Sequence, residues 1–169
     1  TVLRQLGVVP LFERLRVAGL DQPLGVLTGR VVVVPERVET ELRAACELAG
    51  MNEITTEPLD VAPGYVRVSG VGEASFVQPV TALFEAGVLR VLVGTVALLG
   101  EGWDAPSANV LVSASSAATF VRTGQIRGRV FRTDPRQPDK VSSVWHLACL
   151  DPGDPTGGGN VQQLRRRFS

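Results

Sequence analysis

Short apolar runs alternate along the chain with longer segments in which apolar residues recur about every three or four positions. Short, β-branched runs bounded by turn residues are typical of buried strands, whereas the longer spacing is typical of amphipathic helices. The predicted strands are 24–28, 31–34, 65–68, 91–94, 110–112 and 141–150. The predicted helices are 1–19, 36–49, 73–86 and a segment that ends at 132. Strands that alternate with helices predict an α/β fold with a doubly wound, mostly parallel sheet flanked by helices.

The best-defined elements lie in the first half of the chain. The run 31–34 consists of four valines, which is expected of a central parallel strand covered on both faces. The strand at 24–28 is predicted at the edge of the sheet. Pro79 is expected in the first turn of its helix or at a kink, because proline lacks the N–H of the helix interior. The side chains expected to face the core from the helix at 36–49 are Val38, Leu42, Ala45 and Leu48.

Composition adds limits on the class of protein. The chain has 169 residues, 44% of them apolar, and a formal net charge of zero. No apolar run is long enough to span a membrane and no signal peptide opens the chain, so we expect a cytoplasmic protein without a membrane partner. Because the chain opens on Thr1, we expect it to be a piece of a longer protein. Cys46 and Cys149 are expected to be buried free thiols, and with His146 as the single histidine no metal site is predicted.

The zero net charge conceals an uneven distribution. Residues 1–104 contain 8 arginines and 13 acidic residues, whereas residues 105–169 contain 9 lysines and arginines and 4 acidic residues. A basic half of this kind is suited to a polyphosphate partner.

Polar and glycine residues gather in two places between Val91 and Arg132. Thr95 follows the strand at 91–94, and the turn Gly100-Glu101-Gly102-Trp103-Asp104-Ala105-Pro106 comes next. A later helix closes with Gln125-Ile126-Arg127-Gly128-Arg129-Val130-Phe131-Arg132. Helical spacing puts Gln125, Arg129 and Arg132 on one face, together with Arg122, and turns Arg127 away. Arginine suits phosphate binding because its planar fork offers two donors and keeps its charge, although many arginine clusters are solvated helix faces.

These two segments resemble motifs V and VI of the superfamily 2 helicases, in the same order and at a similar spacing. The resemblance covers about residues 31–151 and is closest to the branch that contains restriction-enzyme motor subunits and DEAD/DEAH-type proteins. It implies a second RecA-like domain, a P-loop NTPase-type fold without its own P-loop. The expected organisation is a helical linker or extension at 1–28, the helicase C-terminal domain at 29–151, and a flexible basic tail at 152–169.

The resemblance also implies roles for individual residues. Arg129 and Arg132 would reach the γ-phosphate of ATP, and Gln125 would help to position them or the attacking water. Gly102 would let the backbone approach the phosphates, and Asp104 would accept a hydrogen bond from the ribose. The residues expected to contact nucleic acid at the carboxyl edge of the sheet are Thr95, Ser69 and Gly70. Two simpler roles stay open: Asp104 capping a turn and Thr95 satisfying backbone at a strand end. Trp103 is expected to be a packing anchor.

The only lysine, Lys140, lies in no glycine-rich loop of the kind that binds a triphosphate. No strand ends in an acidic pair suited to Mg²⁺. ATP and Mg²⁺ are therefore expected to be held mainly by an N-terminal RecA-like domain of the same parent protein. The expected function is the C-terminal motor domain of an ATP-dependent helicase or translocase on DNA or RNA, inactive as an ATP hydrolase by itself. One alternative is a non-catalytic helicase-like module that binds nucleic acid or protein; another is an unrelated α/β enzyme that holds a phosphorylated small molecule.

Overall fold

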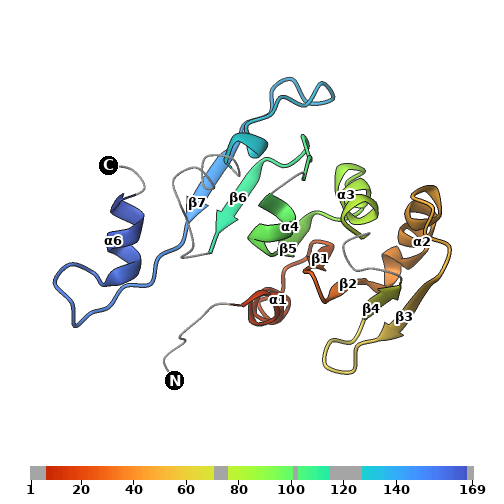
Figure 1. Cartoon of the computed structure of the whole chain (residues 1–169), viewed down its shortest axis with the longest axis horizontal. Helices are drawn as coiled ribbons and strands as arrows, with labels where there is room; N and C mark the ends of the chain where they lie inside the picture. The colour runs from red at the N-terminus through yellow and green to blue at the C-terminus, as the bar shows by residue number, and fades with distance from the viewer. Residues whose placement is uncertain (1–6, 71–75, 101–102, 115–126, 167–169) are drawn as a thin grey trace. The chain divides into compact units, whose positions relative to one another are not determined.

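The computed structural model describes residues 7–70, 76–100, 103–114 and 127–166 (Figure 1). The chain forms two compact units, Thr1–Ala105 and Pro106–Ser169, and each unit is described by itself. Both contain strands and helices, so the predicted α/β class is confirmed.

The first unit contains a five-stranded sheet in the order β3-β4-β2-β1-β5. Its strands are β1 (Leu24–Leu27), β2 (Val32–Pro35), β3 (Ile54–Pro58), β4 (Tyr65–Gly70) and β5 (Val91–Gly94). Its helices are α1 (Val8–Val17), the short 3-10 helix η1 (Glu36–Val38), α2 (Glu39–Leu48), α3 (Val77–Glu85) and α4 (Val96–Gly100).

The direction of most strands differs from the sequence prediction. Only β1 and β5 pair in parallel; β1–β2, β2–β4 and β3–β4 are antiparallel, so the predicted mostly parallel arrangement is wrong for this sheet. The connections explain two of these pairs, β1–β2 and β3–β4, because residues 28–31 and 59–64 are too few for a parallel crossover, which needs about a dozen. In the first of these turns the Thr28 hydroxyl accepts hydrogen bonds from the amides of Arg30 (3.1 Å) and Val31 (2.8 Å).

The core lies on both faces of β2, which is buried along its whole length. Val32 and Val34 belong to a cluster with Leu42 of α2, Val80 of α3 and Phe76, which directly precedes α3. Val33 belongs to a second cluster on the opposite face, which Phe12 of α1 closes. The central position covered on both faces is therefore confirmed for residues 32–34. The parallel pairing predicted for this strand is wrong, because β2 is antiparallel to both β1 and β4.

The position of Pro79 in α3 agrees with the sequence prediction, whereas the buried face of α2 differs from it. Pro79 is the third residue of α3 and lies in its first turn, as predicted. The buried residues of α2 are Leu42 and Cys46, preceded by Val38 of η1, whereas Leu48 is 92% exposed. Successive residues of an α-helix are rotated by about 100° around its axis. Leu48 is six residues after Leu42, so its side chain points about 120° away from the direction of Leu42. The predicted inward position of Leu48 is wrong.

The strand predicted at the sheet edge, β1, lies between β2 and β5 instead. It is buried in all four residues, and α1 contacts both β1 and β5. Residues 24–27 are thus an interior part of the five-stranded sheet.

The second unit is built on the parallel pair β6 (Val110–Ser113) and β7 (Ser143–His146). Helical residues 127–130 and the helix α6 (Gly159–Arg166) complete its described part. The strand predicted at 141–150 ends at His146, and the residues that follow it are largely exposed. Cys149 is therefore exposed, contrary to prediction, while Cys46 is buried and burial raises the pKa of its thiol.

Candidate functional site

The register of the first sheet brings the predicted nucleic-acid contacts to one edge. β1, β4 and β5 run in the same direction, because β1 and β5 are parallel and both β1 and β4 are antiparallel to β2. The strand partners form a row that reads Gly94, Leu27, Val32 and Val68 across the sheet. Thr95 and Ser69–Gly70 follow this row at the carboxyl edge. Three strand spacings of about 4.8 Å separate them, or roughly 14 Å.

The end of β5 is closely packed against the helix that follows Thr95. A Cβ atom added to Gly94 would lie 2.6 Å from Leu99 Cδ1 and 2.8 Å from the Leu27 carbonyl oxygen, so only glycine fits between β1 and α4. The Thr95 carbonyl accepts hydrogen bonds from the amides of Leu98 (3.1 Å) and Leu99 (3.0 Å). Thr95 is half-buried, and its backbone already serves α4 at the strand end. These bonds involve only the Thr95 backbone, so both roles predicted for its side chain stay open.

Trp103 anchors the turn that carries Asp104. The indole Nε1 donates a hydrogen bond to Thr81 Oγ1 at 2.8 Å, and the ring lies 5.9 Å from that of Phe84. Trp103 and Ala105 are buried, whereas Asp104 between them is exposed. Trp103 is therefore the packing anchor predicted from the sequence. Gly102, the predicted backbone contact to phosphate, lies outside the described residues.

The arginine segment in the second unit is only partly helical. Residues 127–130 are helical, and Arg132 follows in a bend whose amide donates to the Arg129 carbonyl at 3.3 Å. Arg129 is half-buried and Arg132 is exposed. A helix that continues through Arg132 was predicted, and this is wrong for its last two residues. Gln125 and Arg122, which complete the predicted face, lie outside the described residues.

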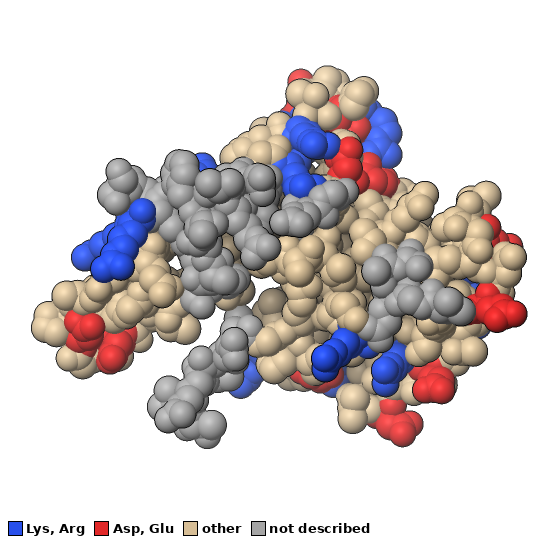
Figure 2. Space-filling view, in the orientation of Figure 1, with Lys and Arg blue, Asp and Glu red and all other residues tan. Residues whose placement is uncertain are grey.

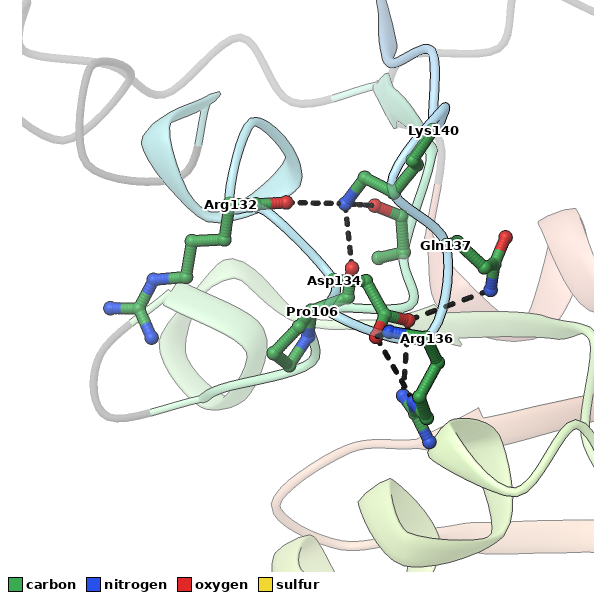
Figure 3. Close-up of polar contacts among 7 residues, drawn as sticks. Pro106, Arg132, Asp134, Arg136, Gln137 and Lys140 are labelled. Carbon is green, nitrogen blue, oxygen red and sulfur yellow. Dashed lines mark hydrogen bonds and ion pairs between the residues drawn. The ribbon is translucent and has the colours of Figure 1, made fainter.

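Lys140 holds the backbone around Arg132 (Figure 3). Its Nζ donates hydrogen bonds to the carbonyl oxygens of Pro106 (2.6 Å), Ala108 (2.9 Å) and Arg132 (2.8 Å). Sequence reasoning missed this residue. The lysine was considered only as a phosphate ligand, and carbonyl acceptors leave no trace in the pattern of side chains.

Asp134 fixes the loop that brings Lys140 back to the arginine segment. Its carboxylate is 2% exposed and accepts hydrogen bonds from the Arg136 amide and guanidinium, each at 3.0 Å to Oδ1. The hydrogen bond from the Arg136 side chain, followed by that from its backbone, lowers the pKa of Asp134. The Gln137 amide also donates to the Asp134 carbonyl at 2.9 Å. The loop at 133–140 is therefore held at both of its ends.

The predicted ATP-site residues are divided between the two units. Asp104 belongs to the first unit, and Arg129 and Arg132 belong to the second. Within the described ranges, no group of three or more His, Cys, Asp and Glu residues is arranged to hold a metal ion. No helix in the same ranges is long and apolar enough to cross a bilayer. Comparison of the chain with protein-family models, curated proteins and solved structures finds no match.

Proposed function

We propose that this chain is the C-terminal motor domain of an ATP-dependent helicase or translocase that acts on DNA or RNA. Its partner is an N-terminal RecA-like domain of the same parent protein, which holds most of the ATP and the Mg²⁺. This chain contributes Asp104 and Gly102 toward the nucleotide and Arg129, Arg132 and Gln125 toward its terminal phosphate. By itself it is inactive as an ATP hydrolase.

The observation that carries the proposal is the structure around the motif V-like turn. A strand ends at Gly94, α4 follows directly, and the buried Trp103 fixes the chain so that Asp104 faces outward. An outward carboxylate on an anchored turn is suited to accept a hydrogen bond from a ribose hydroxyl. The exposure of Asp104 is compatible with the nucleotide-facing role that we propose for it.

A second support is the carboxyl edge of the five-stranded sheet. Thr95 follows β5, and Ser69 lies near the end of β4, which runs in the same direction. Each offers a hydroxyl suited to a phosphate oxygen. Ligands in open α/β sheets bind at the carboxyl ends of strands. In the proposed motor, closure of the cleft around ATP would shift these contacts against those of the N-terminal domain.

The finer assignment, a RecA-like fold, is part of the same proposal. The parallel pairs β1–β5 and β6–β7 agree with it, as does the order of the two motif-like segments along the chain. The antiparallel pairs β1–β2, β2–β4 and β3–β4 depart from the doubly wound pattern.

Arginine substitutions test the proposal in the protein that joins this chain to its N-terminal domain. Arg129→Ala and Arg132→Ala should each lower kcat for ATP hydrolysis by about a hundred- to a thousandfold, or roughly 3–4 kcal/mol, with a much smaller change in ATP affinity. The reason is that an arginine facing the transferred phosphoryl group stabilises charge that develops only in the transition state.

Arg165→Ala is a matched control, because Arg165 is an exposed arginine of the same unit in α6, away from the motif VI-like segment. It should leave kcat within about twofold of the parent value. Normal turnover in both the Arg129 and the Arg132 variants would refute the motor function. Nucleic-acid binding that survived in such variants would favour the non-catalytic binding module.

A further inference from the structure

The ammonium group of Lys140 uses all three of its donors on backbone carbonyls. Its partners are Pro106, Ala108 and Arg132, at 2.6, 2.9 and 2.8 Å. An ammonium has three N–H groups in a tetrahedral arrangement and no acceptor, so three converging carbonyls satisfy it fully. A cation held this way by carbonyl dipoles connects three separate chain segments: the residues after the Trp103 turn, the residues after the arginine helix, and the residues before β7.

The backbone of Lys140 is also held by a hydrogen bond of its own. Its amide donates to the Gln137 carbonyl at 3.0 Å, within the loop that Asp134 holds at the other end. Ser142 Oγ donates to the Val130 carbonyl at 2.7 Å, so the carbonyls at 130 and 132 both have side-chain donors from this stretch. Polar and cationic side chains commonly satisfy the last carbonyls of a helix in this way.

The backbone of Arg132 is held on the side opposite to its guanidinium. In Figure 3 the Arg132 side chain extends away from the lysine and from the Asp134–Arg136 pair, while its carbonyl points at Nζ. Because Arg132 lies after the last helical residue, helix geometry alone does not fix its direction. The contact to Lys140 holds the Arg132 carbonyl, while the Arg132 amide donates to the Arg129 carbonyl at 3.3 Å.

We infer that Lys140 is a positioning residue for Arg132: it fixes the backbone from which the arginine reaches toward a phosphate. The inference rests on the proposed function. Displacement of a catalytic group by about 1 Å can cost on the order of a hundredfold in rate. An arginine side chain cannot replace Lys140 fully, because its planar fork does not direct three donors at carbonyls that surround a single point.

The test is a double-mutant cycle in the protein that contains the N-terminal domain. Lys140→Met, which keeps the length of the side chain and removes its donors, should lower kcat about ten- to a hundredfold and change KM for ATP by less than about threefold. Added to Arg132→Ala, it should cost little more than Arg132→Ala alone, because both act through one side chain. Lys140→Arg should give an intermediate kcat. Ser142→Ala, which removes only the Val130 contact, should keep kcat near normal.

Some outcomes would overturn the inference while leaving the motor function intact. These are a normal kcat in folded Lys140→Met, or a loss that multiplies fully with that of Arg132→Ala, when Arg132→Ala alone lowers kcat about a hundred- to a thousandfold. A normal kcat in Arg132→Ala would instead overturn both the arginine's assigned role and the positioning role that depends on it.

A second measurement applies if Lys140→Met fails to fold. The 169-residue chain has a single lysine, so its ammonium gives one side-chain signal in NMR spectra. Three hydrogen bonds should slow proton exchange of that ammonium by at least about tenfold relative to a free lysine side chain. The slowing should disappear in urea. An ammonium that exchanges like a free lysine in the folded chain would contradict the positioning role.

Discussion

At the scale of single residues, Asp134 makes stability depend on pH. Hydrogen bonds from Arg136 lower the pKa of this carboxylate in the folded chain below its value in the unfolded chain. Its contribution to stability is therefore complete above the unfolded value of about 3.9 and is lost as pH falls through the folded value. We expect the free energy of unfolding of the second unit to decrease below about pH 4.

Urea unfolding between about pH 2.5 and pH 6, followed by the fluorescence of Trp145, measures this dependence. Trp103→Phe in every sample leaves Trp145 as the single reporter, because the chain has two tryptophans. Asp134→Asn should be less stable near neutral pH and should show a flatter profile in acid. An equally steep acid loss in Asp134→Asn would mean that other carboxylates control the transition.

The role of a side chain that contacts other side chains was easier to predict from the sequence than the role of one that binds backbone carbonyls. The anchoring role of Trp103 follows from a large aromatic residue next to a polar turn, and its contacts to Thr81 and Phe84 agree with it. The partners of Lys140 are carbonyls up to 34 positions away along the chain, which any residue type provides. Composition and spacing therefore carry no signal for this contact, and only the fold reveals it.

At the scale of elements, hydrophobic periodicity predicted most strands but not their directions. The valine run is buried and central as expected, because a continuous apolar run has no face to expose to water. Strand direction depends instead on the length and chemistry of the connection. The turn at 28–31 is stabilised by the Thr28 hydroxyl, a contact that a reading based on apolar runs does not detect.

The junction of β5 and α4 gives an element-scale prediction. Gly94→Ala should destabilise the first unit by about 1–3 kcal/mol, because the new methyl group would overlap Leu99 and the Leu27 carbonyl oxygen. Leu99 can shift, but the Leu27 backbone is fixed in the sheet. Urea unfolding monitored by the fluorescence of Trp103, in a Trp145→Phe background, measures the effect.

Gly29→Ala is the matched control for Gly94→Ala. A Cβ atom at Gly29 would meet no atom within 4 Å, and Gly29 does not have a positive φ. Its free energy of unfolding should stay within about 0.5 kcal/mol of the parent value. If the two alanine variants were equally stable, the close packing of α4 on β5 would be wrong.

At the scale of the whole molecule, the charge pattern and the fold divide the chain at nearly the same point. The residues after Asp104 hold 9 basic and 4 acidic residues, and the second unit begins at Pro106. On the face drawn in Figure 2, however, basic and acidic side chains are interspersed and form no broad field of one sign. A single domain supplies few phosphate contacts, so we expect weak binding.

The last prediction concerns that binding. The 169-residue chain should bind single-stranded DNA or RNA weakly and without base preference, with an affinity that falls steeply between about 50 and 200 mM salt. Fluorescence anisotropy with labelled oligonucleotides of unrelated sequence measures both properties.

Thr95→Val and Ser69→Ala should weaken binding at every salt concentration without changing the slope, because they remove neutral hydrogen bonds. Arg30→Gln, at the exposed turn between β1 and β2 on the same sheet edge, should reduce the slope of log affinity against log salt by about 0.7. Glu47→Gln on the exposed part of α2 is the charge-change control, and it should alter neither affinity nor slope. Tight binding that ignored salt and followed base sequence would instead identify a recognition module that reads base edges, and the carboxyl edge would lose its role as a backbone contact.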